Sequence, residues 1–147
     1  TEVPFEDSDG NTQGYSVGTT LAMNPVAEHP LPTMLHEMAH IILGHTSKDG
    51  MKAYRSHRGV MEFQAEAVAL LVSRELEVPD YDESSARAYI QSWLGGSVSD
   101  FVEHDEDAGD TALVEDSTVN AVFSAVDKIL VAGRKAHFEE LKAAEAE

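Results

Sequence analysis

The chain has 147 residues, no cysteine and a formal net charge of −17. Its hydrophobic content of 42% suffices for one globular domain over residues 1–147, and the lack of cysteine excludes disulfides and thiolate metal sites. With 27 acidic and 10 basic residues, the surface repels phosphate groups, which disfavours direct contact with nucleic acid or anionic membranes and favours basic protein or peptide partners.

The sequence contains no recognisable targeting segment. No apolar run reaches the ~18 residues of a membrane-spanning helix, and the start TEVPFEDSDG has neither the basic residues nor the apolar centre of a signal peptide. A soluble protein without cysteine is most compatible with the cytoplasm. Because residue 1 is threonine, a domain cut from a longer chain is an alternative to a complete protein.

The first third of the chain predicts a strand region and then a helix. Residues 15–23, YSVGTTLAM, have the β-branched and aromatic content of an edge or hairpin strand, and NPVAEHPLP after them contains three prolines and predicts a loop. From about Pro32 to Gly44 apolar residues recur at helical spacing on one side. We expect His36, Glu37 and His40 on the opposite side, where Gly44 would keep the wall open.

Three further helices are expected after a polar loop at residues 46–59. The second helix runs from about Val60 to Glu77, and the third covers residues 82–96. After a solvated loop at 97–110, which lacks EF-hand spacing, the last helix runs from about Ser117 to Ala143. This order indicates a mainly helical α+β class. The apolar side chains expected to pack are Tyr89, Ile90, Trp93 and Leu94 in the third helix and Val119, Val122, Phe123, Val126, Ile129, Leu130, Phe138 and Leu141 in the last.

The segment LHEMAHIILGH, residues 35–45, fits the pattern H-E-x-x-H. Residues four apart on a helix stand one turn apart, so His36 and His40 can direct their rings at one metal ion. Glu37 is rotated by about 100° from His36, which places it beside the ion to deprotonate a water molecule. The pattern thus predicts two ligands and a general base.

A catalytic zinc site usually takes a third protein ligand and leaves one position for water. The second helix offers Glu62 and Glu66, which are four residues apart and share a face with small residues that allow close approach to the first helix. We assign Glu62 to the metal and Glu66 to a hydrogen bond with a ligand histidine, with the reverse left open. His57 is the alternative third ligand. Tyr54, His57 and Arg58 are candidates for contact with substrate or oxyanion.

The other histidines do not fit a ligand set. The metzincin pattern would place glycine and histidine where this chain has Leu43 and Thr46. His45 follows His40 too closely and, on a continuing helix, points about 140° away from it, so we expect it outside the site. The histidines expected to be structural or exposed are His29, His104 and His137.

These parts resemble a known group of enzymes. The order GYSVGTTLAMN, LHEMAHIILGH and EFQAEAVALLVSREL resembles the gluzincins, and more narrowly the ImmA/IrrE metallopeptidases and the metallopeptidase domain of ArdC-type antirestriction proteins. The E-x-x-A-[NDE] element of those families is matched by Glu62, Ala65 and Glu66. ARAYIQSWL and VFSAVDKILVAG also resemble the ArdC-type C-terminal segment.

The resemblance implies a zincin-like fold and a Zn²⁺-dependent endopeptidase whose substrate adds as a β-strand beside the strand before the first helix. Zn²⁺ would be held by His36, His40 and Glu62, with Glu37 as base. ImmA/IrrE members cut a DNA-binding repressor, but this chain shows no helix-turn-helix and no single-stranded-DNA-binding domain. The substrate of either family is therefore not carried over.

Two other functions stay open at this point. The charge of −17 also suits a non-catalytic acidic module that keeps a zinc site and captures a basic partner or imitates DNA, as an antirestriction protein would. The third possibility is a different metal-assisted hydrolysis, because the motif activates water without choosing the bond that is attacked. A His/Glu site also accepts several divalent ions.

Overall fold

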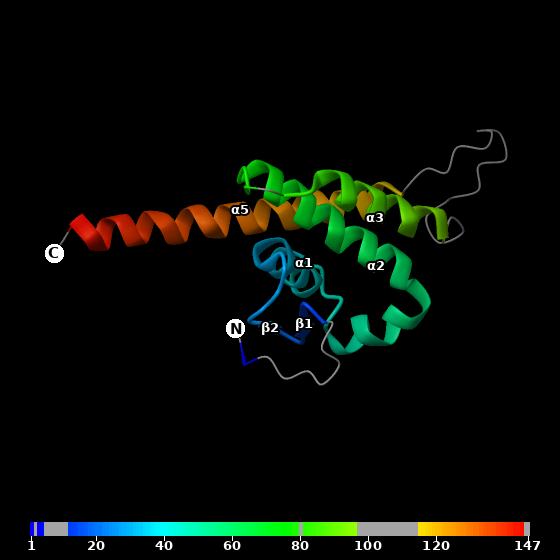
Figure 1. Cartoon of the computed structure of the whole chain (residues 1–147). Coiled ribbons are helices and arrows are strands. Elements are labelled where there is room, and N and C mark those ends of the chain that lie inside the picture. The colour runs from blue at the N-terminus through cyan, green and yellow to red at the C-terminus, as the bar shows by residue number, and fades with distance from the viewer. Residues whose placement is uncertain (2, 5–11, 80, 97–114, 146–147) are drawn as a thin grey trace.

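The computed structural model describes residues 1, 3–4, 12–79, 81–96 and 115–145 (Figure 1). In these described residues a two-stranded hairpin precedes four helices, which confirms the predicted mainly helical α+β class. None of the described helices has the apolar stretch that a bilayer-spanning segment needs. In chain order, the elements are β1 (Gly14–Val17), β2 (Thr20–Met23), α1 (Pro30–Ile42), α2 (Lys48–Glu75), α3 (Glu83–Gly96) and α5 (Asp116–Glu145).

The predicted strand region is a hairpin. β1 and β2 pair antiparallel with Val17 opposite Thr20, and the turn between them contains Gly18 at φ +60°, a conformation that glycine adopts without strain. Thr46 holds this turn, because its Oγ1 donates to the Gly18 carbonyl at 2.6 Å and its own carbonyl accepts from the Gly18 amide at 3.1 Å. The hairpin is thereby tied to the connection between α1 and α2.

Only one edge of the hairpin is covered in the part of the chain that is described. The carbonyl of Thr1 and the amide of Val3 both bond to Leu21, so the N-terminal residues run beside β2. No described strand pairs with the outer edge of β1. Such an edge is a template for an added strand, and β1 itself contacts α1.

Helix α1 starts two residues before the predicted position and ends in a Schellman motif. The amide of His45 donates to the carbonyl of His40 at 2.9 Å, and the amide of Gly44 donates to that of Ile41 at 3.0 Å. Gly44 has φ +80°, the left-handed conformation that this motif requires. Its role is therefore to reverse the chain direction, and Gly44 is not among the residues that line the two cavities beside His36.

The loop expected at residues 46–59 is also wrong, because most of it is the first part of α2. Ser47 caps this helix by accepting from the Gly50 amide at 3.0 Å. A side chain at Gly50 would collide with the carbonyls of Gly44 and His45, so glycine permits the helix to start directly against the preceding turn. The helix is kinked at His57, whose φ and ψ are −123° and 26°. The exposed residues of its first part include Lys48, Asp49, Lys52, Ser56, His57 and Arg58. A helix with this polar composition resembles a loop in the sequence.

The core lies where α1, α2 and α5 meet. Small side chains line the contact, and Ala39, Ala65 and Ala69 are almost completely buried. This agrees with the expected close approach of the first two helices, which decides how near the side chains of the site can come. The remaining core residues are Leu35, Val68, Val72, Val122, Ala125 and Ile129.

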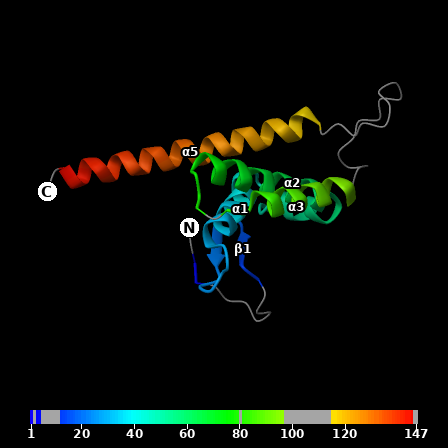
Figure 2. The same cartoon turned by 45° about the horizontal axis from the view of Figure 1, so that its top comes forward.

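Part of the predicted packing face of the last helix is not packed. Phe123 and Phe138 are each 58% exposed, and Figures 1 and 2 show the C-terminal half of α5 extending past the other helices. In α3, Tyr89 is 45% exposed and not buried as expected. Helical periodicity identifies an apolar side but does not supply a partner to cover it.

Candidate metal centre

The structure brings together the three residues predicted as ligands. His36 and His40 stand one turn apart on α1 and meet Glu62 from α2. The two Nε2 atoms are 3.1 Å apart, and Oε2 of Glu62 lies 3.5 Å from that of His36 and 3.9 Å from that of His40. Ligand atoms around a tetrahedral zinc ion are about 3.3 Å apart. These residues therefore form a group that could hold a metal ion.

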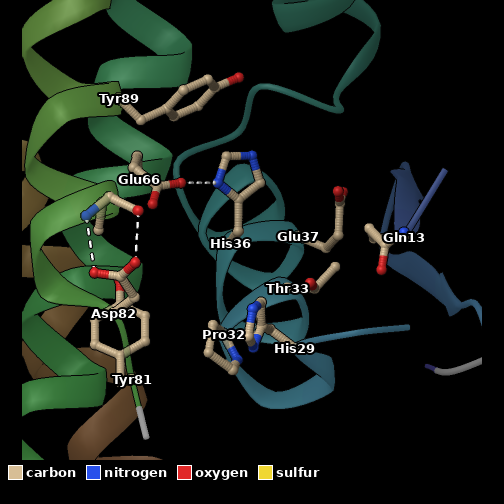
Figure 3. Close-up of a pocket in the computed structure, with 13 residues that line it drawn as sticks. Gln13, His29, Pro32, Thr33, His36, Glu37, Glu66, Tyr81, Asp82 and Tyr89 are labelled. Carbon is tan, nitrogen blue, oxygen red and sulfur yellow. Dashed lines mark hydrogen bonds and ion pairs between the residues drawn. The ribbon is translucent and has the colours of Figure 1, made fainter. Parts of the chain in front are cut away.

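Glu37 lies on the opposite side of His36 from Glu66 (Figure 3). Its Oε2 accepts a hydrogen bond from Ser16 Oγ of β1 at 2.6 Å, a length typical of a bond to a charged carboxylate. Glu37 and the three ligand candidates line one cavity of about 330 Å³. The sequence analysis missed Ser16, because the order of residues does not show that β1 packs against α1 and brings Ser16 to Glu37.

Glu66 has the position expected for an orienting carboxylate. His36 Nδ1 donates to Glu66 Oε2 at 3.0 Å, drawn as a dashed line in Figure 3. A neutral imidazole has one N–H, so this bond leaves the lone pair of His36 on Nε2, the atom that faces His40 and Glu62. The ring is thus held in the tautomer that a metal needs.

The pKa values of His36, His40 and Glu62 are shifted because their side chains lie close together and are largely buried. Burial lowers the pKa of His36, but hydrogen bonds and charges of Glu62 and Glu66 outweigh burial and raise it to about 9. Burial disfavours the charged form of Glu62, yet hydrogen bonds with His36 and Tyr54 lower its pKa to about 2. Burial and the neighbouring charge of His36 lower the pKa of His40 to about 4. In the absence of a metal, a proton on His36 supplies the positive charge that these carboxylates require.

Tyr54 has a different partner from the one expected. Its hydroxyl donates to Oε1 of Glu62, and burial together with this carboxylate raises the pKa of Tyr54 to about 12, so the phenol stays a donor. The bond orients Glu62 with Oε2 toward the histidines. Tyr54 also lines the cavity shared by Glu37 and the ligand candidates, so its contact with substrate or oxyanion stays a prediction. The sequence prediction missed the bond to Glu62 because it placed Tyr54 in a loop.

The alternative ligand and the remaining contact candidates lie outside the ligand group. His57 is exposed at the kink of α2, so the structure does not support it as third ligand. Arg58 is exposed and places its guanidinium 6.0 Å from the ring centre of Tyr54 and 5.5 Å from that of Trp93. His29 and His137 are exposed, as expected. His104 and the loop predicted at 97–110 lie outside the described residues.

His45 was expected outside the site, but the structure places its ring against His40, one of the ligand candidates. It is buried, and its Nδ1 lies 3.0 Å from Nδ1 of His40. The estimate from helical rotation failed because α1 ends at Ile42 and Gly44 turns the chain back. Glycine in the last position of the amphipathic pattern was the available signal for that reversal.

A second cavity, of about 520 Å³, adjoins the ligand group (Figure 3). Glu66, Tyr81, Asp82 and Tyr89 form one side, and Glu37 lies on the other. Three carboxylates thus line it, whereas none of its lining residues is lysine or arginine. The space next to His36 is electrostatically suited to a cation.

Comparisons with known proteins add no relatives to this picture. A scan against models of protein families, a search of curated proteins and a search of solved structures each find no match. Function is therefore inferred from the geometry of the site.

Proposed function

We propose that this chain is a zinc-dependent hydrolase of the zincin class. Within that class, we propose a gluzincin-like endopeptidase that hydrolyses peptide bonds. The observation that carries the proposal is the convergence of His36 Nε2, His40 Nε2 and Glu62 Oε2 in a cavity that Glu37 also lines. H-E-x-x-H occurs by chance in many helices, but a chance match does not require a buried carboxylate from a second helix at ligand distance.

The chemistry of the donor set fits Zn²⁺. Two imidazole nitrogens and one carboxylate oxygen are one of the established ligand sets of a catalytic zinc ion, and three protein ligands leave one tetrahedral position for water. The bond between His36 Nδ1 and Glu66 directs the Nε2 lone pair of His36 into the group. When bound there, the ion would lower the pKa of water and polarise the carbonyl of a substrate.

The roles proposed for Glu37, Ser16 and Tyr54 are proton transfer and the orientation of the two carboxylates. Ser16 donates to Oε2 of Glu37 and would hold this carboxylate in place while it accepts the proton of the attacking water. Glu37 then delivers this proton to the nitrogen of the leaving amine, which prevents that amine from attacking back. Tyr54 holds Glu62 through Oε1, so the carboxylate keeps one orientation while its Oε2 serves the ion.

Two features support an extended peptide substrate with a basic side chain. The outer edge of β1 has no described strand beside it, and Ser16 of that strand touches Glu37, so a peptide added to this edge would pass close to the base. Next to it, the 520 Å³ cavity offers Glu66 and Asp82 together with the rings of Tyr81 and Tyr89. Carboxylates and aromatic walls suit lysine or arginine.

Glu37→Gln tests the mechanism. This substitution keeps the size of the side chain and removes the base, so zinc should stay bound while cleavage falls by about 10²–10⁴-fold. Zinc content and cleavage of labelled casein and of peptide pools are measured for wild type and variant side by side. Cleavage by the variant at the wild-type rate would show that Glu37 is not the base.

The net charge of −17 favours one second candidate, an acidic binding module that retains the zinc site without catalysis. Inhibition of a restriction enzyme by the purified chain distinguishes the two functions. Inhibition that survives both Glu37→Gln and zinc removal supports the acidic module, whereas dependence on both supports proteolysis.

A further inference from the structure

A line of hydrogen bonds leads from His40 through His45 and Gln64 to the first turn of α5. Nδ1 of His40 lies 3.0 Å from Nδ1 of His45, and Nε2 of His45 lies 3.1 Å from Oε1 of Gln64 on α2. Nε2 of Gln64 donates to the carbonyl of Thr118 in the first turn of α5 at 3.4 Å. His40, His45 and Gln64 are each at least nine-tenths buried.

The fixed end of this line determines the direction of every bond in it. The Thr118 carbonyl can only accept, so Gln64 presents its NH₂ there and its oxygen to His45. That oxygen also only accepts, so His45 carries its proton on Nε2 and, as a neutral ring, accepts on Nδ1. His40 must then donate from Nδ1, which leaves its lone pair on Nε2, the atom that faces His36 and Glu62.

We propose that His45 and Gln64 are positioning residues of the metal centre, which fix His40 in its ligand tautomer and thereby set metal affinity. The inference depends on the proposed metal site, because it assigns the two residues a role toward an ion held by His40. It gives the two ligand histidines different supports, a carboxylate behind His36 and a neutral relay behind His40. With Glu62 and Glu66 as the contacting carboxylates, a neutral relay avoids a third buried negative charge.

Packing alone does not account for these two residues. A buried imidazole and a buried amide each cost free energy unless their polar atoms are paired, and an apolar pair of similar volume would fill the same space. Their bonds run to each other, to a proposed metal ligand and to a backbone carbonyl. If Gln64 is replaced by an apolar residue, the ring of His45 is free to change tautomer. If His45 is replaced by an apolar residue, the ring of His40 is free to do so.

The first test uses matched variants of His45. His45→Asn keeps an acceptor near the position of Nδ1, whereas His45→Leu removes it, and Gln64→Met removes the acceptor of His45 at similar volume. Zinc affinity is measured by competition with a chromophoric chelator, and the absorption spectrum of the cobalt form reports ligand geometry. The leucine variant should bind zinc about 10–100-fold more weakly, Gln64→Met should be weaker in the same direction, and the asparagine variant should stay within about threefold of wild type.

A purely structural role predicts a different pattern. Equal losses for His45→Asn and His45→Leu, or affinities within threefold of wild type for all variants, would overturn the proposal. Unfolding curves recorded with EDTA show whether each variant is folded before its affinity is interpreted.

The second test needs no substitution. Long-range ¹H–¹⁵N NMR spectra of the whole chain assign the protonated nitrogen of each histidine ring, and we expect Nδ1–H for His40 and Nε2–H for His45. The opposite tautomer of either ring contradicts the inference, whatever the metal content of the sample. If wild type binds no zinc but shows the expected tautomers, the proposed function fails while the relay itself is established.

Discussion

The charge on His36 makes the stability of the metal-free protein depend on pH in a calculable way. The pKa of His36 is raised from 6.5 to about 9 by Glu62 and Glu66 against the effect of burial, and its side chain is 18% exposed. Because the folded pKa is above the unfolded one, the contribution to stability is complete below pH 6.5 and is lost as pH rises through about 9. The difference corresponds to about 3 kcal/mol, lost at up to about 1.4 kcal/mol per pH unit.

Urea unfolding in EDTA, repeated from pH 6 to 10, measures this loss. His36→Gln is the control, because it removes the titrating ring and keeps every other histidine, so the free energy of unfolding of the variant should change less with pH over that window. Equal pH slopes for wild type and His36→Gln would refute the electrostatic reasoning.

The proton on His36 also competes with a metal ion for the ring, so apparent zinc affinity should rise about tenfold per pH unit between pH 6 and 7.

Three further substitutions test the supports of the site. Tyr54→Phe removes the hydrogen bond to Glu62, and zinc affinity should fall about tenfold in a chelator competition while the fold is retained. Ser16→Ala removes the hydrogen bond to Glu37, so kcat should fall about tenfold at unchanged zinc content, and an unaltered kcat argues against an orienting role. Gly44→Ala places a side chain at φ +80°, which should lower the free energy of unfolding by about 1–2 kcal/mol, whereas Gly44→Asn should lower it less.

Much of the site follows from local spacing. His36, Glu37 and His40 lie near one another because residues one and four apart on a helix do so wherever that helix is placed. A carboxylate of α2 was also predictable as third ligand, since Glu62 and Glu66 share the face that carries its alanines, and Glu62 was the one assigned. The mainly helical class followed from periodicity in the same way.

The predictions that were wrong concern residues whose surroundings depend on how distant segments pack together. Residues 48–57 form an exposed helix whose polar composition resembles a loop, and this placed Tyr54 too far from Glu62. His45 was predicted to lie outside the site because its angle from His40 was calculated for a continuing helix. The Schellman motif at Gly44 instead reverses the chain, and the ring of His45 contacts that of His40. Phe123 and Phe138 lie on a helical side that no described element covers fully.

The sequence by itself determined the donor types, because with no cysteine any ion must be held by histidine and carboxylate, and it determined the pairing of ligands one turn apart on α1. Only the tertiary structure decided which ring nitrogens could offer a lone pair to an ion held by this group. Ring tautomers depend on the hydrogen-bond partner of the far nitrogen, and these partners, Glu66 for His36 and His45 for His40, are set by the packing of α2 and by the turn after α1.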